Sequence, residues 1–252
     1  MIFTFTDRFG NTDQCVTSVT VTDGTAPTIS CPDGVTVNAA PNTCTASVSL
    51  SATAADQCSP PQPAPAVAGN GPTTYGLGST THTFTATDAS GNHASCDRVV
   101  TVRDVTPPVV IPRTGLSLWP ANHQYRAVSA GECVAVTDAC NGQTASPVTS
   151  DDVKIYKVTS DEVEDAADPK GGGDNGDGNT LADMVIVDNG HVNLRAERQG
   201  TSNGRIYTIF VKVKDAAGNE TLSSCNVQVP HDQGQGAIAV QGPGPGDSVT
   251  RP

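Results

Sequence analysis

The pattern Asp-x-x-Gly-Asn occurs three times in this chain, each time with similar neighbours. It spans residues 7–11, 88–92 and 215–219. A cysteine follows each copy, in order Cys15, Cys96 and Cys225. A pattern that recurs together with its flanks indicates a repeated structural unit, so the chain is expected to consist of copies of one element.

Apolar residues alternate with other residues on both sides of the pattern. Before it stand Phe3, Phe5, Phe84, Ala86, Tyr207, Ile209, Val211 and Val213. After it stand Val19, Val21, Val100, Val102, Val227 and Val229. A period of two is that of a β-strand with one buried face, and Asp, Gly and Asn are residues that close a hairpin turn. We therefore interpret the unit as strand, turn, strand, in which the Asp and Asn side chains close the turn rather than bind a ligand.

Composition and charge narrow the class of protein. Aromatic residues make up 4% of the chain, while it holds 25 Gly and 18 Pro, a mixture that favours many short strands joined by turns. The net charge of −12 opposes binding to nucleic acid or to an anionic membrane, because both need basic residues. No stretch is apolar enough to insert into a membrane. Divalent cations are the expected ligands of such an acidic chain.

The eight cysteines indicate an oxidising compartment. They include no Cys-x-x-Cys pair, so a zinc site is not expected; a cytosolic protein with free thiols is the alternative. The opening "MIFTFTDRFGN" has neither a basic nor an apolar signal-peptide region. We therefore expect a fragment of a longer secreted or cell-surface protein, without a signal peptide of its own.

Residues 25–105 resemble a bacterial hyalin repeat (HYR) domain. The resemblance rests on motifs that occur in order: "PTISCPDGVTV", "CTASVSLSATAADQC", "GLGSTTHTFTATDASGNHASCDRVVTVRD" and a following "TPP". A later region is similar to a sandwich domain of exported bacterial proteins through "LWPANH", "VTDAC", "GDGNT" and "VPHDQ". The resemblance implies immunoglobulin-like β-sandwiches in an extracellular adhesive or spacer protein, and it carries no known catalytic residues.

The predicted fold class is therefore all-β, with tandem immunoglobulin-like β-sandwiches. Residues 1–24 are expected to be the final hairpin of a preceding HYR-like domain, and residues 25–105 the first complete sandwich. Residues 106–231 are expected to form a second sandwich with an acidic, glycine-rich insert at about 159–183. The Gly- and Pro-rich tail, residues 232–252, is predicted to be disordered.

Comparison between the copies predicts three disulfides. "AADQC" ends at Cys58 and "VTDAC" at Cys140, and each unit later carries a cysteine after its Gly-Asn turn. The expected bonds are Cys58–Cys96, Cys140–Cys225 and Cys31–Cys44, the last because both its cysteines lack a counterpart in the later unit. Cys15 is expected to lack its partner, and Cys133 is left over.

The acidic insert is the candidate metal site. "DNGDGNT" places oxygen donors at Asp174, Asp177 and Asn179, with glycines that let a turn wrap around a hard cation such as Ca²⁺. Further ligands would come from Asp161, Glu162 and Asp183. The alternative is a solvated, disordered acidic loop. Arg195, Glu197 and Arg205 are expected to form a surface ion network with the carboxylates of the insert.

No residue constellation predicts catalysis, so we do not expect an enzyme. The expected function is that of an extracellular structural or adhesive module, a monomeric part of a longer chain, with a surface protein or a glycan as partner. The alternative is an accessory carbohydrate-binding module of a secreted hydrolase. Trp119, the only Trp, would then stack on a sugar, although a lone Trp in a sandwich is expected to fill the core.

Overall fold

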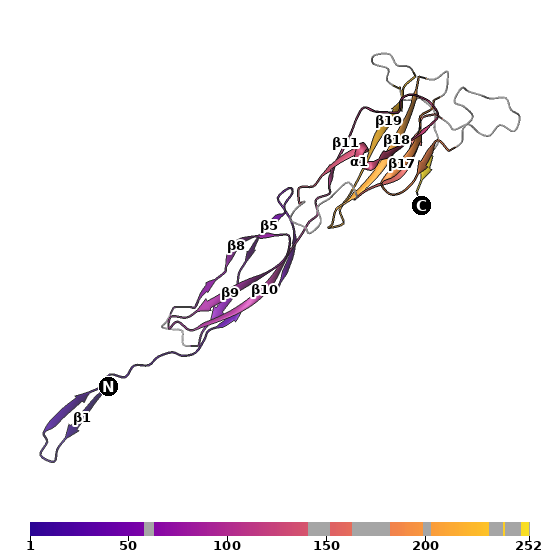
Figure 1. The fold of residues 1–252 in the computed structure, drawn as a ribbon. Helices are drawn as coiled ribbons and strands as arrows, with labels where there is room; N and C mark the ends of the chain where they lie inside the picture. The colour runs from indigo at the N-terminus through magenta and orange to yellow at the C-terminus, as the bar shows by residue number, and fades with distance from the viewer. Residues whose placement is uncertain are drawn as a thin grey trace. The chain divides into compact units, whose positions relative to one another are not determined.

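The structure, a computed structural model, consists of β-strands with one short helix among the residues that it describes (Figure 1). These are residues 1–57, 63–140, 152–162, 182–198, 203–231, 239 and 248–251. The chain folds as two compact units: Met1–Val37 with Ala46–Val102, and Asn38–Thr45 with Arg103–Pro252. Each contains a β-sandwich, and the predicted fold class, tandem immunoglobulin-like sandwiches, is confirmed.

The described residues of the first unit form ten strands, all short except the last two. They are β1 (Ile2–Thr6), β2 (Thr12–Val16), β3 (Thr28–Ser30), β4 (Val35–Asn38), β5 (Thr45–Leu50), β6 (Thr53–Ala55), β7 (Ala66–Ala68), β8 (Gly71–Gly76), β9 (Gly78–Thr87) and β10 (His93–Arg103). One sheet has the order β4-β10-β9-β7, and the pairs β3-β6 and β5-β8 form smaller sheets. Within the part of the chain that the structure describes, β1 and β2 pair only with each other.

The core of this sandwich depends on the alternation seen in the sequence. Phe84 and Ala86 of β9, and Val100 and Val102 of β10, are buried, while most of their neighbours along each strand are more exposed. Alanines, valines, Leu50 and Tyr75 fill the rest. The predicted period of two is thus confirmed for this hairpin.

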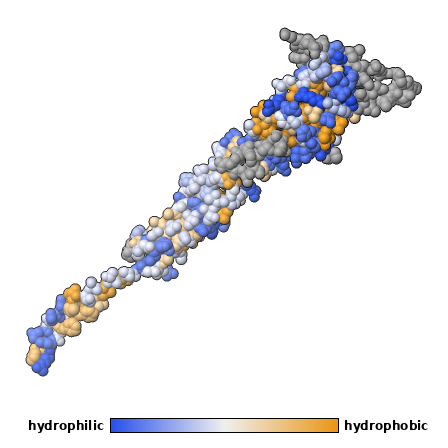
Figure 2. Space-filling view, in the orientation of Figure 1, coloured by the Kyte–Doolittle hydropathy of each residue, from blue (hydrophilic) through white to orange (hydrophobic). Residues whose placement is uncertain are grey.

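The β1–β2 hairpin has the same alternation but no core. Its register runs from Ile2↔Val16 to Thr6↔Thr12, and its three phenylalanines are exposed, as are Val19 and Val21 after it. Figure 2 shows orange, apolar patches on the surface of the N-terminal hairpin.

The second unit is the larger sandwich. Its elements are β11 (Val109–Pro112), β12 (Leu116–Ser117), β13 (Tyr125–Ser129), α1 (Ala130–Cys133), β14 (Val134–Thr137), β15 (Val153–Ser160), β16 (Met184–Ile186), β17 (His191–Arg195), β18 (Arg205–Lys214), β19 (Glu220–Val229) and β20 (Ser248–Thr250). The main sheet has the order β12-β19-β18-β15-β20, the facing sheet β13-β17-β16, and β11 pairs with β14. Ser129 caps α1 in a capping box with Glu132.

The core of the second unit lies between these sheets. Tyr207, Ile209, Val211 and Val213 of β18 are fully buried, as their alternation predicts, and they pack with residues of β15, β17 and β19. β18 and β19 pair over their whole length. This long hairpin positions the side chains described below.

The C-terminal tail differs from its predicted disorder at two places. Residues 248–250 form β20, which pairs antiparallel with β15, with Val158 opposite Val249. Ala239 is buried beside Gly204. The physical reason is that the edge of β15 offers unpaired backbone groups, and Val249 packs against the core.

Candidate functional site

The repeated Asp closes its turn, as the sequence predicts. Asp88 Oδ1 accepts hydrogen bonds from the backbone N–H groups of Ser90 at 2.9 Å and Asn92 at 2.8 Å, and Asn92 Nδ2 donates to Asp88 Oδ2 at 2.9 Å. The bond from the Asn92 side chain and these backbone bonds hold the pKa of Asp88 below its ordinary value, against the effect of burial. The copies at Asp7 and Asp215 have the same side-chain bond from Asn11 and Asn219.

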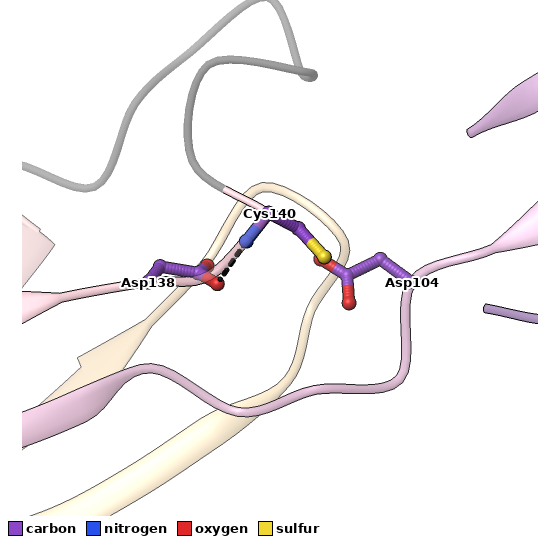
Figure 3. Close-up of side chains that lie close together, drawn as sticks. All are labelled: Asp104, Asp138 and Cys140. Atoms are coloured by element: carbon purple, nitrogen blue, oxygen red, sulfur yellow. Dashed lines mark hydrogen bonds between the residues drawn. The ribbon is translucent and has the colours of Figure 1, made fainter. Parts of the chain in front are cut away.

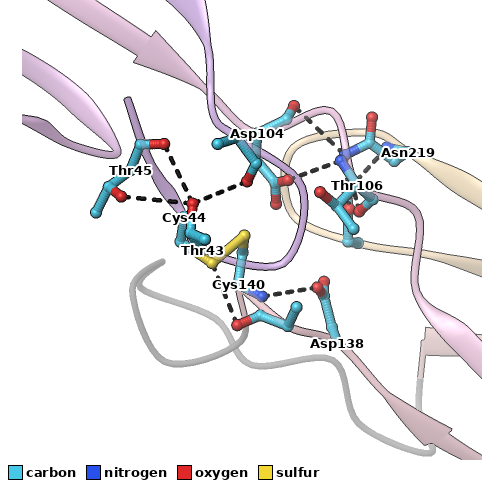
Figure 4. The surroundings of a disulfide bond; sticks show 11 residues. Thr43, Cys44, Thr45, Asp104, Thr106, Asp138, Cys140 and Asn219 are labelled. Carbon is cyan, nitrogen blue, oxygen red and sulfur yellow. Dashed lines mark hydrogen bonds between the residues drawn. A yellow bond between two sulfur atoms is a disulfide. The ribbon is translucent and has the colours of Figure 1, made fainter. Parts of the chain in front are cut away.

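The repeated Asn also holds the segment that enters each sandwich. Asn92 Nδ2 donates to the carbonyl oxygen of Asp23 at 3.1 Å. In the second unit Asn219 Nδ2 lies 3.4 Å from the carbonyl oxygens of both Asp104 and Thr106 (Figure 4). The Asp-x-x-Gly-Asn pattern therefore forms a turn and also acts as a clamp, because its Asn side chain holds the segment that enters the sandwich.

Each clamp brings carboxylates together. Among the described residues, the ligand atoms of Asp23, Asp56 and Asp88 lie within 4.8 Å of one another, and those of Asp104, Asp138 and Cys140 do likewise (Figure 3). Sequence analysis missed both groups. The available signal was that Asp56 and Asp138 lie at matching places in "AADQC" and "VTDAC", and Asp23 and Asp104 at matching places after the repeated hairpins.

The two groups differ in what they can bind. Cys140 is bonded to Cys44, so it offers no thiolate, and its backbone N–H donates to Asp138 at 2.9 Å. Asp23, Asp56 and Asp88 supply three hard oxygen donors, the ligand type that Ca²⁺ takes. The group in the first unit is thus the better cation site.

The predicted calcium ligands fall into two sets. Asp174, Asp177 and Asn179 lie outside the described residues. Of the others, Asp161 accepts the backbone N–H of Ile206 at 2.7 Å.

Glu162 and Asp183, by contrast, are ion-paired with an arginine. Arg205 Nε donates to Glu162 Oε2 at 2.9 Å, and Arg205 Nη1 donates to Asp183 Oδ2. These two carboxylates therefore share one guanidinium, which offsets one of their two negative charges.

The predicted network of Arg195, Glu197 and Arg205 forms, but it is buried and not on the surface. Arg205, Asp183 and Glu197 are at most 1% exposed. Arg195 Nε lies 3.3 Å from Asp183 Oδ1 and 3.6 Å from Glu197 Oε2. The reason is register: Arg205 shares a face of β18 with Tyr207 and Ile209, which point into the core, so its charge must be matched there.

Tyr207 completes the network. Its hydroxyl accepts from Arg205 Nη1 at 3.1 Å and donates to the carbonyl of Arg195 at 2.9 Å. Burial raises the pKa of Tyr207, so the phenol stays protonated. Burial alone would lower the pKa of Arg205, but Tyr207, Asp183 and Glu162 outweigh it and raise that pKa.

The disulfides correct the predicted pairing. The bonds are Cys31–Cys96, Cys44–Cys140 and Cys133–Cys225, in place of the expected Cys58–Cys96, Cys140–Cys225 and Cys31–Cys44. Among the described residues Cys15 is exposed and free, and Cys58 lies outside them.

The pairing follows from position in the fold. Cys133, expected to be left over, ends α1 in the core, where it meets Cys225 of β19. Cys140 instead follows β14 in the loop beside Cys44 (Figure 4). Equivalent positions in the sequence therefore did not mean equivalent partners.

Trp119 does not fill the core. It is 41% exposed, while its neighbour Leu118 is buried in the core of the second unit. Nearby, Nδ1 of the partly exposed His123 lies 3.2 Å from Glu197 Oε2. The expectation of a core Trp was wrong because the inward side of this segment is taken by Leu118.

One family model matches the first sandwich. Residues 22–102 match the model of the HYR domain, the family that the motifs of residues 25–105 resemble. No curated protein matches the chain. No helix among the described residues is long and apolar enough to cross a membrane.

Solved structures with related architecture are distant. The protocadherin GammaB4 extracellular domain is 16% identical over 90% of this chain and 37% of its own, with a TM-score of 0.39. Protocadherin Gamma B2 cadherin domains 1–5 are 13% identical over 91% and 45%, with a TM-score of 0.43. A Ca²⁺-stabilised adhesin of an Antarctic bacterium is 17% identical over 89% and 54%, with a TM-score of 0.25. The chain thus spans less than half the length of these protocadherin chains.

Proposed function

We propose that the chain is a non-catalytic structural or adhesive module of an extracellular protein. The observation that carries this proposal is the set of disulfides, Cys31–Cys96 in the first sandwich and Cys44–Cys140 and Cys133–Cys225 in the second unit. Disulfides persist in oxidising compartments, and small sandwiches with modest cores depend on them. The HYR domain at residues 22–102 supports the same placement.

The arrangement suits a module that spaces or attaches other parts of a protein. We propose that residues 25–105 and 106–231 act as successive sandwiches. In each, an Asn of the repeated turn holds the entering segment, at Asp23 and at Asp104. Such bonds fix the entering segment against its own sandwich.

The test is the redox state and location of the protein in its source. Free thiols are alkylated at once in intact cells, and the surface fraction is collected by protease shaving. We expect the protein in that fraction, with Cys31, Cys96, Cys133 and Cys225 unreactive until a reductant is added. Recovery from the cytosol with these cysteines alkylated would refute the proposal.

We also propose that Ca²⁺ stabilises the module. The acidic insert supplies Asp174, Asp177 and Asn179, while Glu162 and Asp183 are held by Arg205 and are poor further ligands. The group of Asp23, Asp56 and Asp88 is a second place for the ion, because three carboxylates within 4.8 Å repel one another unless a cation neutralises them.

Calorimetry with Ca²⁺ against EDTA tests this proposal and separates the two places. Loss of binding heat in Asp174→Asn with Asp177→Asn would assign the ion to the insert. Loss in Asp56→Asn would assign it to the first sandwich. Absence of heat and of any rise in melting temperature in the unchanged protein would refute calcium binding at both.

Exposure of Trp119 favours carbohydrate binding as a second candidate function. An exposed indole offers an apolar face for stacking, and a glycan is one of the partners that an extracellular module meets. A glycan array with the unchanged protein, Trp119→Ala and the control Phe9→Ala tests it, since Phe9 is exposed in the β1–β2 hairpin. Binding that only Trp119→Ala abolishes would support this function, and equal binding by both variants would exclude a role for the indole.

A further inference from the structure

The β1–β2 hairpin repeats the β9–β10 hairpin residue for residue. Phe3 pairs with Cys15, as Phe84 pairs with Cys96. At the turn, Thr6 pairs with Thr12, as Thr87 pairs with His93. The two hairpins thus have one register, and matching residues point to matching faces.

The difference between the hairpins is what covers them. Phe3 is 47% exposed, Val19 66% and Val21 89%. Their counterparts Phe84, Val100 and Val102 are 0%, 0% and 2% exposed. The same apolar face is therefore buried in one copy and open in the other.

The covered copy shows which elements bury this apolar face. β10 pairs with β4 along its outer edge, β9 pairs with β7, and Cys96 is bonded to Cys31, next to β3. Among the described residues, β1 and β2 form a sheet of two strands, and Cys15 is free. A hairpin that exposes its apolar face is marginal in water.

We propose that the β1–β2 hairpin binds the complementary half of an HYR-like sandwich, a polypeptide partner that supplies strands equivalent to β3–β8. Its first strand carries a cysteine at the position of Cys31, and that cysteine bonds to Cys15. This inference does not depend on the extracellular role or on calcium. The covered β9–β10 hairpin defines the geometry that the partner must have.

The bond forms by thiol–disulfide exchange with a small disulfide such as oxidised glutathione. The Cys15 thiolate attacks this disulfide, forms a mixed disulfide and releases one glutathione thiolate. The partner's thiolate then displaces the second glutathione, so two protein thiols lose two electrons and one glutathione disulfide gains them. Binding of the apolar face first would hold the two cysteines together.

The test uses the full chain and, as the partner, a peptide of residues 25–77, which carries the sequence of β3–β8. Cys44→Ser and Cys58→Ser in the peptide leave Cys31 as its single thiol. In a glutathione redox buffer we expect a one-to-one adduct through Cys15, identified by mass mapping. Hydrogen exchange of residues 2–16 should slow at least about tenfold.

Controls separate this pairing from general thiol reactivity. Cys15→Ser in the full chain should abolish the adduct, and a peptide that keeps Cys44 in place of Cys31 should give several-fold less. Equal adduct from both peptides, or a dimer of the full chain through two Cys15 residues in preference to the adduct, would overturn the proposal.

Two further experiments detect the interaction even where the peptide packs weakly against the hairpin. Phe5→Ala in the full chain matches the size of Ala86, its counterpart in β9. Fusion of the peptide ahead of residue 1 raises its effective concentration. Failure of the Cys31–Cys15 bond and of exchange protection in both arms would also overturn the proposal.

Discussion

The side-chain amide of Asn92 donates a hydrogen bond to the backbone carbonyl of Asp23, 69 residues earlier in the chain, at 3.1 Å. The same amide donates to the Asp88 carboxylate, so the turn and the entering segment form one hydrogen-bonded unit. Asn219 repeats the arrangement at Asp104. A local turn signal in the sequence therefore has a long-range structural role.

Asn92→Ala should lower the free energy of unfolding of the first sandwich by about 1–2 kcal/mol. The substitution removes the side-chain amide that donates to the Asp23 carbonyl and to Asp88 Oδ2. Urea unfolding, monitored through hydrogen exchange of the β10 amides, measures this loss of stability. Asn11→Ala is the matched control, since Asn11 makes the same bond to Asp7 in the exposed hairpin. Equal losses in both variants would contradict the role of the clamp.

The Asp88 carboxylate should make the first sandwich sensitive to acid. Its folded-state pKa lies below the ordinary 3.8 because the Asn92 side chain donates to the charged form. A depressed pKa means that its stabilisation is present above pH 3.8 and is lost as pH falls through the lower folded-state pKa. Asp88→Asn should therefore show a smaller loss of stability below that pH, measured by thermal melts from pH 6 to about 2. Parallel acid profiles of the two proteins would rule out this contribution.

Local features of this fold could be predicted from the sequence, and pairings over long distances could not. Alternation around Asp88 and Asp215 gave the strands and turns because each depends on a few neighbouring residues. The disulfide partner of Cys96 depends on which distant segment packs beside β10 in the folded chain, and no local sequence pattern contains that information. The motif comparison chose Cys58 in place of Cys31 for this reason.

The candidate site was predictable to the same degree. The carboxylates of Glu162 and Asp183 could be identified as interacting groups, but their partner Arg205 was expected at the surface. Its burial depends on the register of β18 against β15 and β19, which places residue 205 on the core face. The group of Asp23, Asp56 and Asp88 could be recognised only in the folded chain, because its members are distant in sequence.

Arg205→Met should lower the stability of the second sandwich by about 3–5 kcal/mol. The substitution preserves much of the apolar volume but removes the cation that Glu162 and Asp183 share, so that Arg195 alone remains beside Asp183. Arg205→Lys should lose less, since it keeps the charge but not the planar geometry that reaches both carboxylates. Differential scanning calorimetry measures the three proteins.

A surface pair provides the control for Arg205. Lys212 Nζ lies 3.2 Å from Glu220 Oε1, and both side chains are well exposed. Lys212→Met should change stability by less than about 1 kcal/mol. If Arg205→Met has no larger effect than Lys212→Met, the buried network does not stabilise the fold.

The three disulfides should be reduced in an order set by burial. Cys31 and Cys96 are partly exposed, whereas Cys133 and Cys225 lie in the core of the second unit and Cys44 and Cys140 are also buried. Exchange requires a thiolate to reach a sulfur atom, so Cys31–Cys96 should open first in the native protein, and Cys133–Cys225 only when the second sandwich unfolds. Limited reduction, alkylation and peptide mass mapping give the order, and a denatured sample, in which burial no longer differs, is the control. Native-state reduction of Cys133–Cys225 ahead of Cys31–Cys96, or recovery of a Cys140–Cys225 peptide, would contradict the arrangement of the cores described above.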